Sequence, residues 1–167
     1  KVQAITISLF LSMSSLFGSA LAQSPQTQTH YTNVRFHYSI CYPADLFIPQ
    51  GESENSDGQT FLAKDGTELR VWGGHNINEQ SIIAEMEDDI DYLTKDGGAV
   101  TYKTSKSNWF VISGKIGEKI YYQKTIRNKY NKEDIFITYI LTYDARNTSH
   151  YEPLIGVLNA CFQSSPK

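Results

Sequence analysis

The stretch DIFITYILTY, residues 134–143, is apolar over most of its length. Its apolar and aromatic side chains occupy both odd and even positions, so an extended strand would present them on both faces. A strand of this kind is typical of the interior of a sheet that is covered by a packed layer on each side. The stretch therefore predicts a central strand, and the remaining chain is expected to supply its neighbours and both covering layers.

Several other segments carry the patterns of strands. VRFHYSICYP, residues 34–43, alternates large side chains with smaller or polar ones and ends at Pro43. Residues 59–74 fit two short strands joined at Asp65-Gly66, which is a strong hairpin signal. Further candidates lie at 99–105, 108–115 and 119–128. We expect these strands to form one antiparallel sheet.

Two segments have the helical period instead. One begins after Asn78, has acidic residues around its apolar stripe, and ends at Gly97-Gly98, while the other spans 149–163. The apolar stripes consist of Ile82, Ile83, Met86, Ile90 and Leu93 in the first, and Leu154, Val157, Leu158, Cys161 and Phe162 in the second. Helices on opposite faces of one antiparallel sheet predict an α+β protein with three α/β/α layers.

The N-terminal sequence KVQAITISLFLSMSSLFGSALAQ has the pattern of an export signal. One Lys precedes an apolar run that ends in small residues, so we expect residues 1–22 to be a signal peptide cleaved after Ala22. A membrane anchor is the alternative, although Ser and Gly interrupt the run and no basic cluster follows it. Residues 23–33 are expected to be a flexible lead-in and 34–167 a single domain. The predicted location is periplasmic or secreted.

The chain has two cysteines, Cys41 and Cys161. In an oxidising compartment two such cysteines are expected to pair, and the bridge would tie the last helix to the first strand. Closing so long a loop restricts the unfolded chain by roughly 4–5 kcal/mol in the entropy model. Two buried, unpaired thiols are the alternative.

The phrase YSICYP, residues 38–43, followed by a large apolar residue at Phe47, is similar to the opening of exported bacterial members of the Mog1/PsbP-like superfamily. The segment from Gly51 to Gly73 also resembles a phrase of such proteins. The resemblance implies a central antiparallel sheet flanked by helices. The superfamily includes photosystem accessory proteins, a small-GTPase-binding protein and envelope proteins. Its shared motifs are structural, so no functional residue is carried over from it.

The loop GESENSDG, residues 51–58, is rich in calcium-ligand side chains but departs from the EF-hand pattern. Ser53 stands where Asp is required, and Lys64 stands where a bidentate Glu is required. A turn before a strand is therefore the favoured interpretation. A looser calcium site made by Glu52, Glu54 and Asp57 is the alternative.

Catalytic motifs are weak in this sequence. The four histidines, His30, His37, His75 and His150, have no zinc-ligand spacing, and no Gly-x-Ser-x-Gly elbow occurs. Triads are recognised by geometry and not by sequence order, so an enzyme remains the alternative. It would be a hydrolase or a metal-dependent enzyme with a site near His75 and the 51–58 loop. No cofactor motif is present.

Three groups of residues are candidates for binding. Trp72, His75, Asn76 and Trp109 could line a cleft at one end of the sheet. A basic, Tyr-containing hairpin could bind an anionic glycan, a lipid headgroup or an acidic protein surface, or it could simply protect a sheet edge. Its basic residues are Lys119, Lys124, Arg127, Lys129 and Lys132. Glu85, Asp88 and Asp89 could share a cation, although the solvated face of a helix is the favoured interpretation.

The net charge of -3 gives no general attraction for nucleic acid. The sequence therefore predicts a non-catalytic binding or accessory protein of the cell envelope that contacts a protein or another envelope component. An inhibitory or stabilising partner of a secreted toxin or enzyme is a further alternative.

Overall fold

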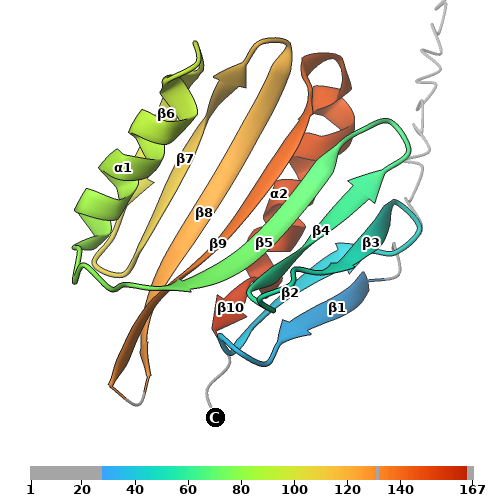
Figure 1. Cartoon of the computed structure of the whole chain (residues 1–167). Coiled ribbons are helices and arrows are strands. Elements are labelled where there is room, and N and C mark those ends of the chain that lie inside the picture. The colour runs from blue at the N-terminus through green and yellow to red at the C-terminus, as the bar shows by residue number, and fades with distance from the viewer. Residues whose placement is uncertain (1–27, 131, 165–167) are drawn as a thin grey trace, which may run out of the picture.

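A computed structural model describes residues 28–130 and 132–164. Its larger sheet has seven antiparallel strands in the order β3-β4-β5-β9-β8-β7-β6 (Figure 1). These are β3 (Phe47–Glu52), β4 (Gly58–Ala63), β5 (Glu68–His75), β6 (Ala99–Ser105), β7 (Trp109–Ile116), β8 (Lys119–Tyr130) and β9 (Glu133–Asp144). The smaller sheet has the order β1-β2-β10, with β1 (Gln28–Asn33), β2 (Tyr38–Pro43) and β10 (Gln163–Ser164). The helices are α1 (Ile82–Thr94), the short 3-10 helix η1 (Ala145–Asn147) and α2 (Thr148–Cys161).

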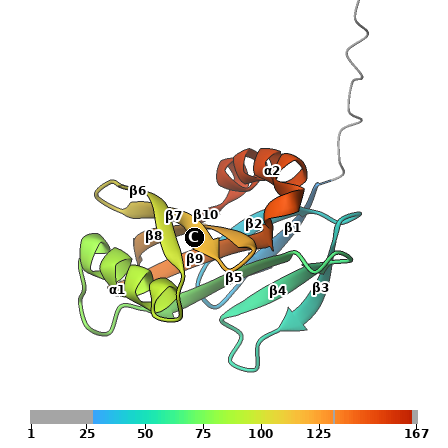
Figure 2. The same ribbon diagram turned by 90° about the horizontal axis from the view of Figure 1, so that it is seen from above.

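Strand β9 lies in the middle of the larger sheet, as its sequence predicts. Its odd-numbered residues, such as Ile137 and Tyr139, pack in one core with the smaller sheet and α2. Its even-numbered residues Phe136 and Ile140 pack in a second core with α1. Figure 2 shows the two helices on opposite sides of the sheet. The predicted three-layer α+β architecture is therefore confirmed.

The first strands differ from the prediction. Residues 28–33, expected to belong to a flexible lead-in, form β1 and pair with β2 from Gln28↔Pro43 to Asn33↔Tyr38, so that expectation was wrong. The strand expected over 34–43 begins only at Tyr38, because residues 34–37 form the turn from β1. Asn33 Oδ1 accepts a hydrogen bond from the Phe36 amide at 2.8 Å and stabilises that turn. The signal peptide expected over 1–22 lies outside the described residues, as do residues 23–27.

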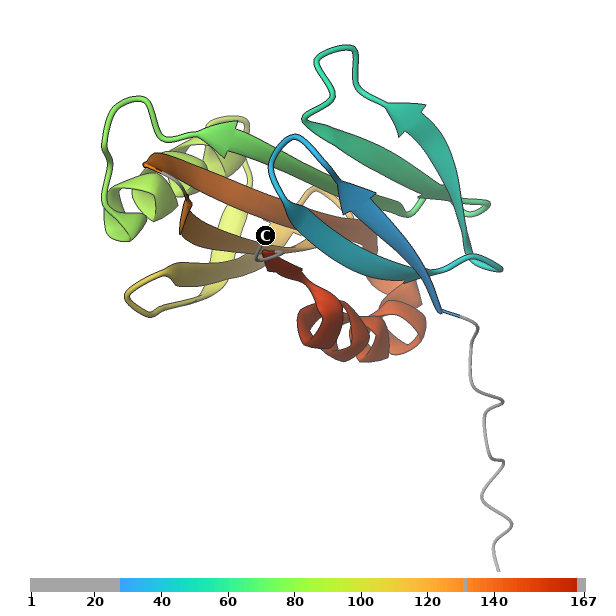
Figure 3. The same cartoon turned by 90° about the horizontal axis from the view of Figure 1, so that it is seen from below.

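The smaller sheet lies beside α2, and the two together cover one face of the larger sheet. In Figure 3 the blue strands of the smaller sheet lie between the red helix α2 and the teal strands β3 and β4. Every residue of β2 is buried. Cys41 of β2 forms a disulfide with Cys161 at the end of α2, with Cα atoms 5.8 Å apart, so the predicted bridge is confirmed. Within the described residues, no helix has the length and apolar character required to cross a membrane.

Candidate functional site

The β8–β9 hairpin extends beyond both of its neighbours in the sheet. β8 and β9 pair as far as Tyr130↔Glu133. In contrast, β7 pairs with β8 only as far as Trp109↔Ile126, and β5 pairs with β9 only as far as His75↔Ile135. Residues 127–130 and 132–134 therefore form a projecting arm, visible at the lower left of Figure 1, which we call the hairpin arm.

An open cleft of about 780 Å³ lies between the hairpin arm and the loop that joins β5 to α1. We call it the arm cleft. Its lining residues are His75, Asn76, Ile77, Glu79, Arg127, Lys129, Lys132, Glu133 and Asp134. The cleft exists because β5 stops at His75 while β8 and β9 continue, which leaves the base of the arm without a neighbouring strand.

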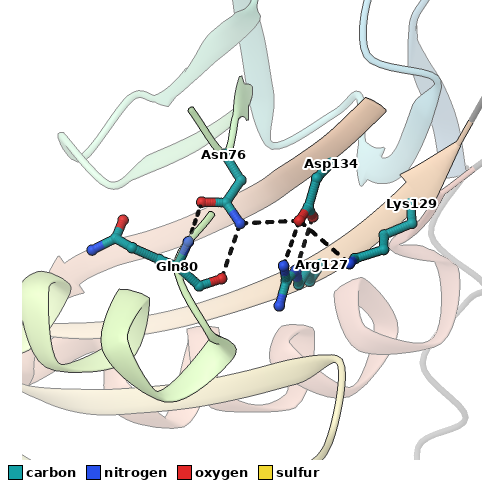
Figure 4. Close-up of polar contacts among 5 residues, drawn as sticks. All are labelled: Asn76, Gln80, Arg127, Lys129 and Asp134. Atoms are coloured by element: carbon teal, nitrogen blue, oxygen red, sulfur yellow. Dashed lines mark hydrogen bonds and ion pairs between the residues drawn. The ribbon is translucent and has the colours of Figure 1, made fainter. Parts of the chain in front are cut away.

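Asp134 is the centre of the polar contacts at the base of the arm (Figure 4). Arg127 Nε donates a hydrogen bond to Asp134 Oδ1 at 2.8 Å, and the Arg127 NH2 group donates to Oδ2. Asn76 Nδ2 donates to the same Oδ2 at 3.2 Å. Lys129 Nζ lies 3.7 Å from it. One carboxylate thus joins both strands of the arm to the opposite wall.

Asn76 fixes that opposite wall. Its Nδ2 also donates to the Gln80 carbonyl at 2.9 Å, and its Oδ1 accepts from the Gln80 amide at 2.8 Å. The Asn76 amide donates to the Asp134 carbonyl at 2.8 Å. Because Asn76 is only 7% exposed, these bonds are shielded from competing water. The loop is therefore held against β9 by side-chain and backbone bonds together.

The charges of the arm cleft are mixed. Hydrogen bonding to Arg127 is the main cause that lowers the pKa of Asp134, and the same pair raises the pKa of Arg127. Both groups are thus ionised at neutral pH and neutralise each other. Lys129 and Lys132 are exposed beside them, and the lining also contains Glu79 and Glu133. Such a lining suits a surface that carries both signs better than a uniformly anionic polymer.

The five basic residues of the predicted hairpin surface do not lie together. Arg127, Lys129 and Lys132 line the arm cleft. Lys119 pairs with Asp144 at the other end of β8, roughly 33 Å along the strand from Lys129 at ~3.3 Å per residue. Lys124 Nζ lies 6.0 Å from the centre of the Trp109 ring, and burial lowers its pKa. The basic group is therefore divided between two ends and two faces of the sheet.

The predicted cleft of Trp72, His75, Asn76 and Trp109 is brought together only in part. Trp72, His75 and Asn76 line a cavity of about 110 Å³ beside the arm cleft. Trp109 pairs with Ile126, which packs in the α2-side core, whereas Trp72 packs in the α1-side core. The two tryptophans consequently lie on opposite faces of the sheet. Ligand binding by the three residues that do meet stays a prediction.

The 51–58 loop is held by its own side chains. Asp57 accepts hydrogen bonds from Ser53 Oγ at 2.6 Å and from Asn55 Nδ2 at 2.8 Å. Glu52 accepts from the Tyr31 hydroxyl at 2.6 Å. Among residues 28–130 and 132–164, no group of three His, Cys, Asp or Glu side chains is placed to hold a metal ion. The loop thus has the side-chain bonds of a turn, and calcium binding by Glu52, Glu54 and Asp57 stays a prediction.

The neighbour of the His75 ring is an aromatic side chain. The His75 ring contacts the Phe36 ring, with centroids 5.1 Å apart. Within the described part of the chain, no hydrogen bond joins His75 to an acid and a serine, which is the arrangement that a hydrolase triad requires.

Sequence reasoning missed Asp134 and Gln80 as parts of the site. The sequence did contain a signal. Arg127 and Asp134 lie on either side of the short turn that joins two predicted strands. Using it requires the register, because Arg127 pairs with Phe136 and reaches Asp134 diagonally on the same face.

No protein-family model matches this chain. No curated protein matches it at a significant level of sequence similarity.

Three solved structures are similar to it. Cyanobacterial PsbP (CyanoP) from Synechocystis sp. PCC 6803 has 11% identity and a TM-score of 0.62, over 89% of this chain and 98% of that chain. The Ran-binding protein Mog1p of Saccharomyces cerevisiae has 9% identity and a TM-score of 0.58, over 83% and 96%. LpqN of Mycobacterium tuberculosis, involved in cell envelope biogenesis, has 13% identity and a TM-score of 0.53, over 86% and 87%. The chain thus has a Mog1/PsbP-like fold, as its sequence resemblance predicts.

Proposed function

We propose that this protein is a non-catalytic accessory protein of the cell envelope that binds another protein through the arm cleft. The observation that carries the proposal is the open, mixed-charge cleft of about 780 Å³ between the hairpin arm and the β5–α1 loop. Protein interfaces combine an apolar anchor with a polar rim. Ile77, which is 85% exposed, would be the anchor, and Lys129 and Lys132 would be part of the rim.

The hydrogen bonds between the two cleft walls support the same proposal. Asn76 and Asp134 connect the two walls through hydrogen bonds that do not involve the exposed rim. A site whose walls are fixed before binding loses less conformational entropy when a partner docks. The rim can therefore contact a partner while the base keeps its shape.

The disulfide supports an envelope location. Disulfides persist in oxidising compartments, and Cys41–Cys161 is the bridge expected of an exported protein. We propose that residues 1–22 direct export and are then removed. Two of the similar structures come from proteins whose names state Ran binding or a part in cell envelope biogenesis. They make a binding role for this fold reasonable, and the partner proposed here is an envelope protein.

Charge reversal at the rim tests the proposal. The oxidised protein would be used to capture partners from an envelope extract, beside a Lys129→Glu/Lys132→Glu variant. A matched control is Lys64→Glu/Lys115→Glu, because both lysines are exposed and lie at the opposite end of the sheet. We expect one discrete protein to be captured by the wild type and the control, and roughly tenfold less by the rim variant.

Equal capture by the rim variant and the control would contradict the arm cleft as the binding surface. The identity of the captured protein separates an envelope component from a secreted toxin or enzyme. An Ile77→Asp variant gives an independent second readout, since it changes the apolar anchor and leaves the hydrogen bonds of Asn76 in place.

A further inference from the structure

The small cavity beside the arm cleft has an unusual combination of walls. It measures about 110 Å³, which is roughly the volume of three or four water molecules at ~30 Å³ each. Trp72 and Phe136 contribute aromatic rings, and the buried residues Asn76 and Thr138 contribute polar groups. Glu85, from the first turn of α1, is the acidic residue of the lining. The cavity therefore combines aromatic surface, oxygen acceptors and one acid.

The described residues around the cavity do not neutralise the carboxyl group of Glu85. No Lys or Arg is among the residues that line the cavity, and in the described part of the chain burial and the charge of Asp88 are the influences on this carboxyl group, with no hydrogen bond or ion pair to it. Burial is the main cause that raises its pKa, and the negative charge of Asp88 adds to the effect. The ionised carboxylate is therefore less stable here than in water, and a cation in the cavity would relieve that cost.

The nearby cations have other partners. Arg127 is held by Asp134. Arg70 lies over the Trp72 ring, with its Cζ 5.4 Å from the ring centre, and its Nε is 3.8 Å from Glu68. The Arg70 contact also indicates that the π face of this tryptophan attracts positive charge.

The wall behind the cavity is polar and fixed. Thr138 Oγ1 is hydrogen bonded to Thr125 Oγ1 at 2.9 Å, and Gln123 Nε2 donates to Thr125 at 3.4 Å. Gln123 Nε2 also donates to Asp89 Oδ2 at 2.6 Å. These three sheet residues are at most 3% exposed, so a buried polar chain leads from the cavity wall to Asp89, a second acid of α1. The chain adds no positive group to the cavity.

We propose that this cavity binds an aliphatic ammonium group, whose charge pairs with Glu85 and whose methylene groups contact Trp72 and Phe136. Ammonium groups over aromatic rings are attracted by the ring quadrupole, and a carboxylate adds a charge-assisted hydrogen bond. The volume of about 110 Å³ suits a short alkylammonium group. This proposal does not depend on the arm cleft being a protein-binding surface.

Nuclear magnetic resonance of the two tryptophan indoles tests the proposal. Trp72 lines the cavity and Trp109 lies on the opposite face, so the second indole is an internal control. The folded protein would be titrated at pH 8 with n-butylammonium chloride and, separately, with n-butanol. We expect a saturable shift of the Trp72 signal with the amine, a much smaller shift with the alcohol, and no change of Trp109.

A charge-neutral variant identifies the acid. Glu85→Gln should weaken amine binding by about tenfold or more, because it removes the charged partner and keeps the shape. Glu87→Gln is the matched control, since Glu87 is on the same helix but pairs with Lys103 at 3.7 Å. It should change the affinity by less than about twofold. Equal responses to amine and alcohol, or unchanged binding in Glu85→Gln, would overturn the proposal.

The source of the ammonium group needs one further titration. Nα-acetyl-lysine methylamide presents the same ammonium group at the end of a lysine side chain. Binding as tight as that of butylammonium would assign the cavity to a lysine of a protein or peptide. Binding of butylammonium alone would assign it to a free amine.

Discussion

The ionisation of Asp89 makes the stability of the domain depend on pH. It belongs to α1 and faces Gln123 of the sheet, and burial is the main cause that raises its pKa to about 7, with the charge of Glu85 adding to the shift. The hydrogen bond from Gln123 opposes the shift without cancelling it. Because the folded pKa is above the value of 3.8 for a free side chain, the unfolded state loses this proton first. The contribution of Asp89 to stability is therefore complete below that value and is lost as the pH rises to about 7.

Asp89→Asn should remove this pH dependence. Asn has the same shape and still accepts the bond from Gln123, but it carries no charge. We expect the free energy of unfolding at pH 8 to increase by about 1–3 kcal/mol over the wild type, and the gain to vanish below pH ~4. Urea unfolding at several pH values measures it. Asp91→Asn, on the exposed side of the same helix, should show no such gain, and a gain that is independent of pH would contradict the assignment.

Contacts between single residues can be predicted from the sequence only where they do not depend on the register of the strands. Cys41–Cys161 could be predicted because parity and compartment restrict the choice to one pair. The bond between Arg127 and Asp134 could not, since the residues are diagonal neighbours and are defined only when β8 and β9 are aligned. Trp109 was placed in the wrong cleft for the same reason, because a shift of one residue moves a side chain to the other face.

Strand β5 depends on one glycine for its contact with the turn between β1 and β2. A Cβ atom at Gly73 would lie 2.6 Å from both Cβ and Cγ of Phe36. Phe36 is 3% exposed and also contacts His75, so it has little room to move. The absence of a side chain at Gly73 thus allows the smaller sheet to pack against the larger one.

Gly73→Ala should destabilise the protein by about 1–3 kcal/mol, because overpacking displaces a buried ring. The adjacent Gly74 is a matched control, since a Cβ atom there would meet nothing within 4 Å. Gly74→Ala should be neutral or slightly stabilising, because alanine restricts the unfolded chain. Equal midpoints of urea unfolding for the two variants would show that the contact with Phe36 is dispensable.

The elements that could be predicted are those with a strong apolar pattern. β9 has apolar residues on both faces, and α1 has one stripe that ends before two glycines, so both are identified from sequence. β1 has few apolar residues and owes its order to backbone pairing with β2. Val34 and Phe36 continue the alternating pattern of β2 toward the N-terminus, so the sequence predicts a strand where the structure has a turn. Val34 is in fact 79% exposed. β3 is an edge strand in which only Phe47 is buried, so it lacks a pattern to read.

At the scale of the whole molecule, the layers could be predicted but the arm cleft could not. The layers could be predicted because the spacing of the apolar residues in each segment shows which of its faces is buried. The cleft follows from a difference in length between β5 and the β8–β9 hairpin, which are distant in sequence and adjacent only through β9. Unequal strand ends become visible only when the register of the whole sheet is known.

The disulfide is the covalent link that holds α2 and the smaller sheet together. It joins residues separated by 120 positions, so it restricts the unfolded chain strongly. A Cys41→Ala/Cys161→Ala variant should lose up to about 4–5 kcal/mol of unfolding free energy in the entropy model. Urea unfolding of the variant, and of the wild type with and without a reductant, measures the loss.

The same variant separates stability from binding. The arm cleft is built from β5, β8, β9 and the β5–α1 loop, none of which contains a bridged cysteine. The variant should therefore still capture its partner at temperatures well below its lowered midpoint, while α2 and β10 exchange their amide hydrogens faster than in the oxidised protein. Reduction of the wild type should reproduce both effects. If reduction left the midpoint unchanged, the bridge would not stabilise the fold, and the attachment of α2 to β2 would have to come from apolar packing, such as that of Leu154 and Leu158, and from the pairing of β10 with β2.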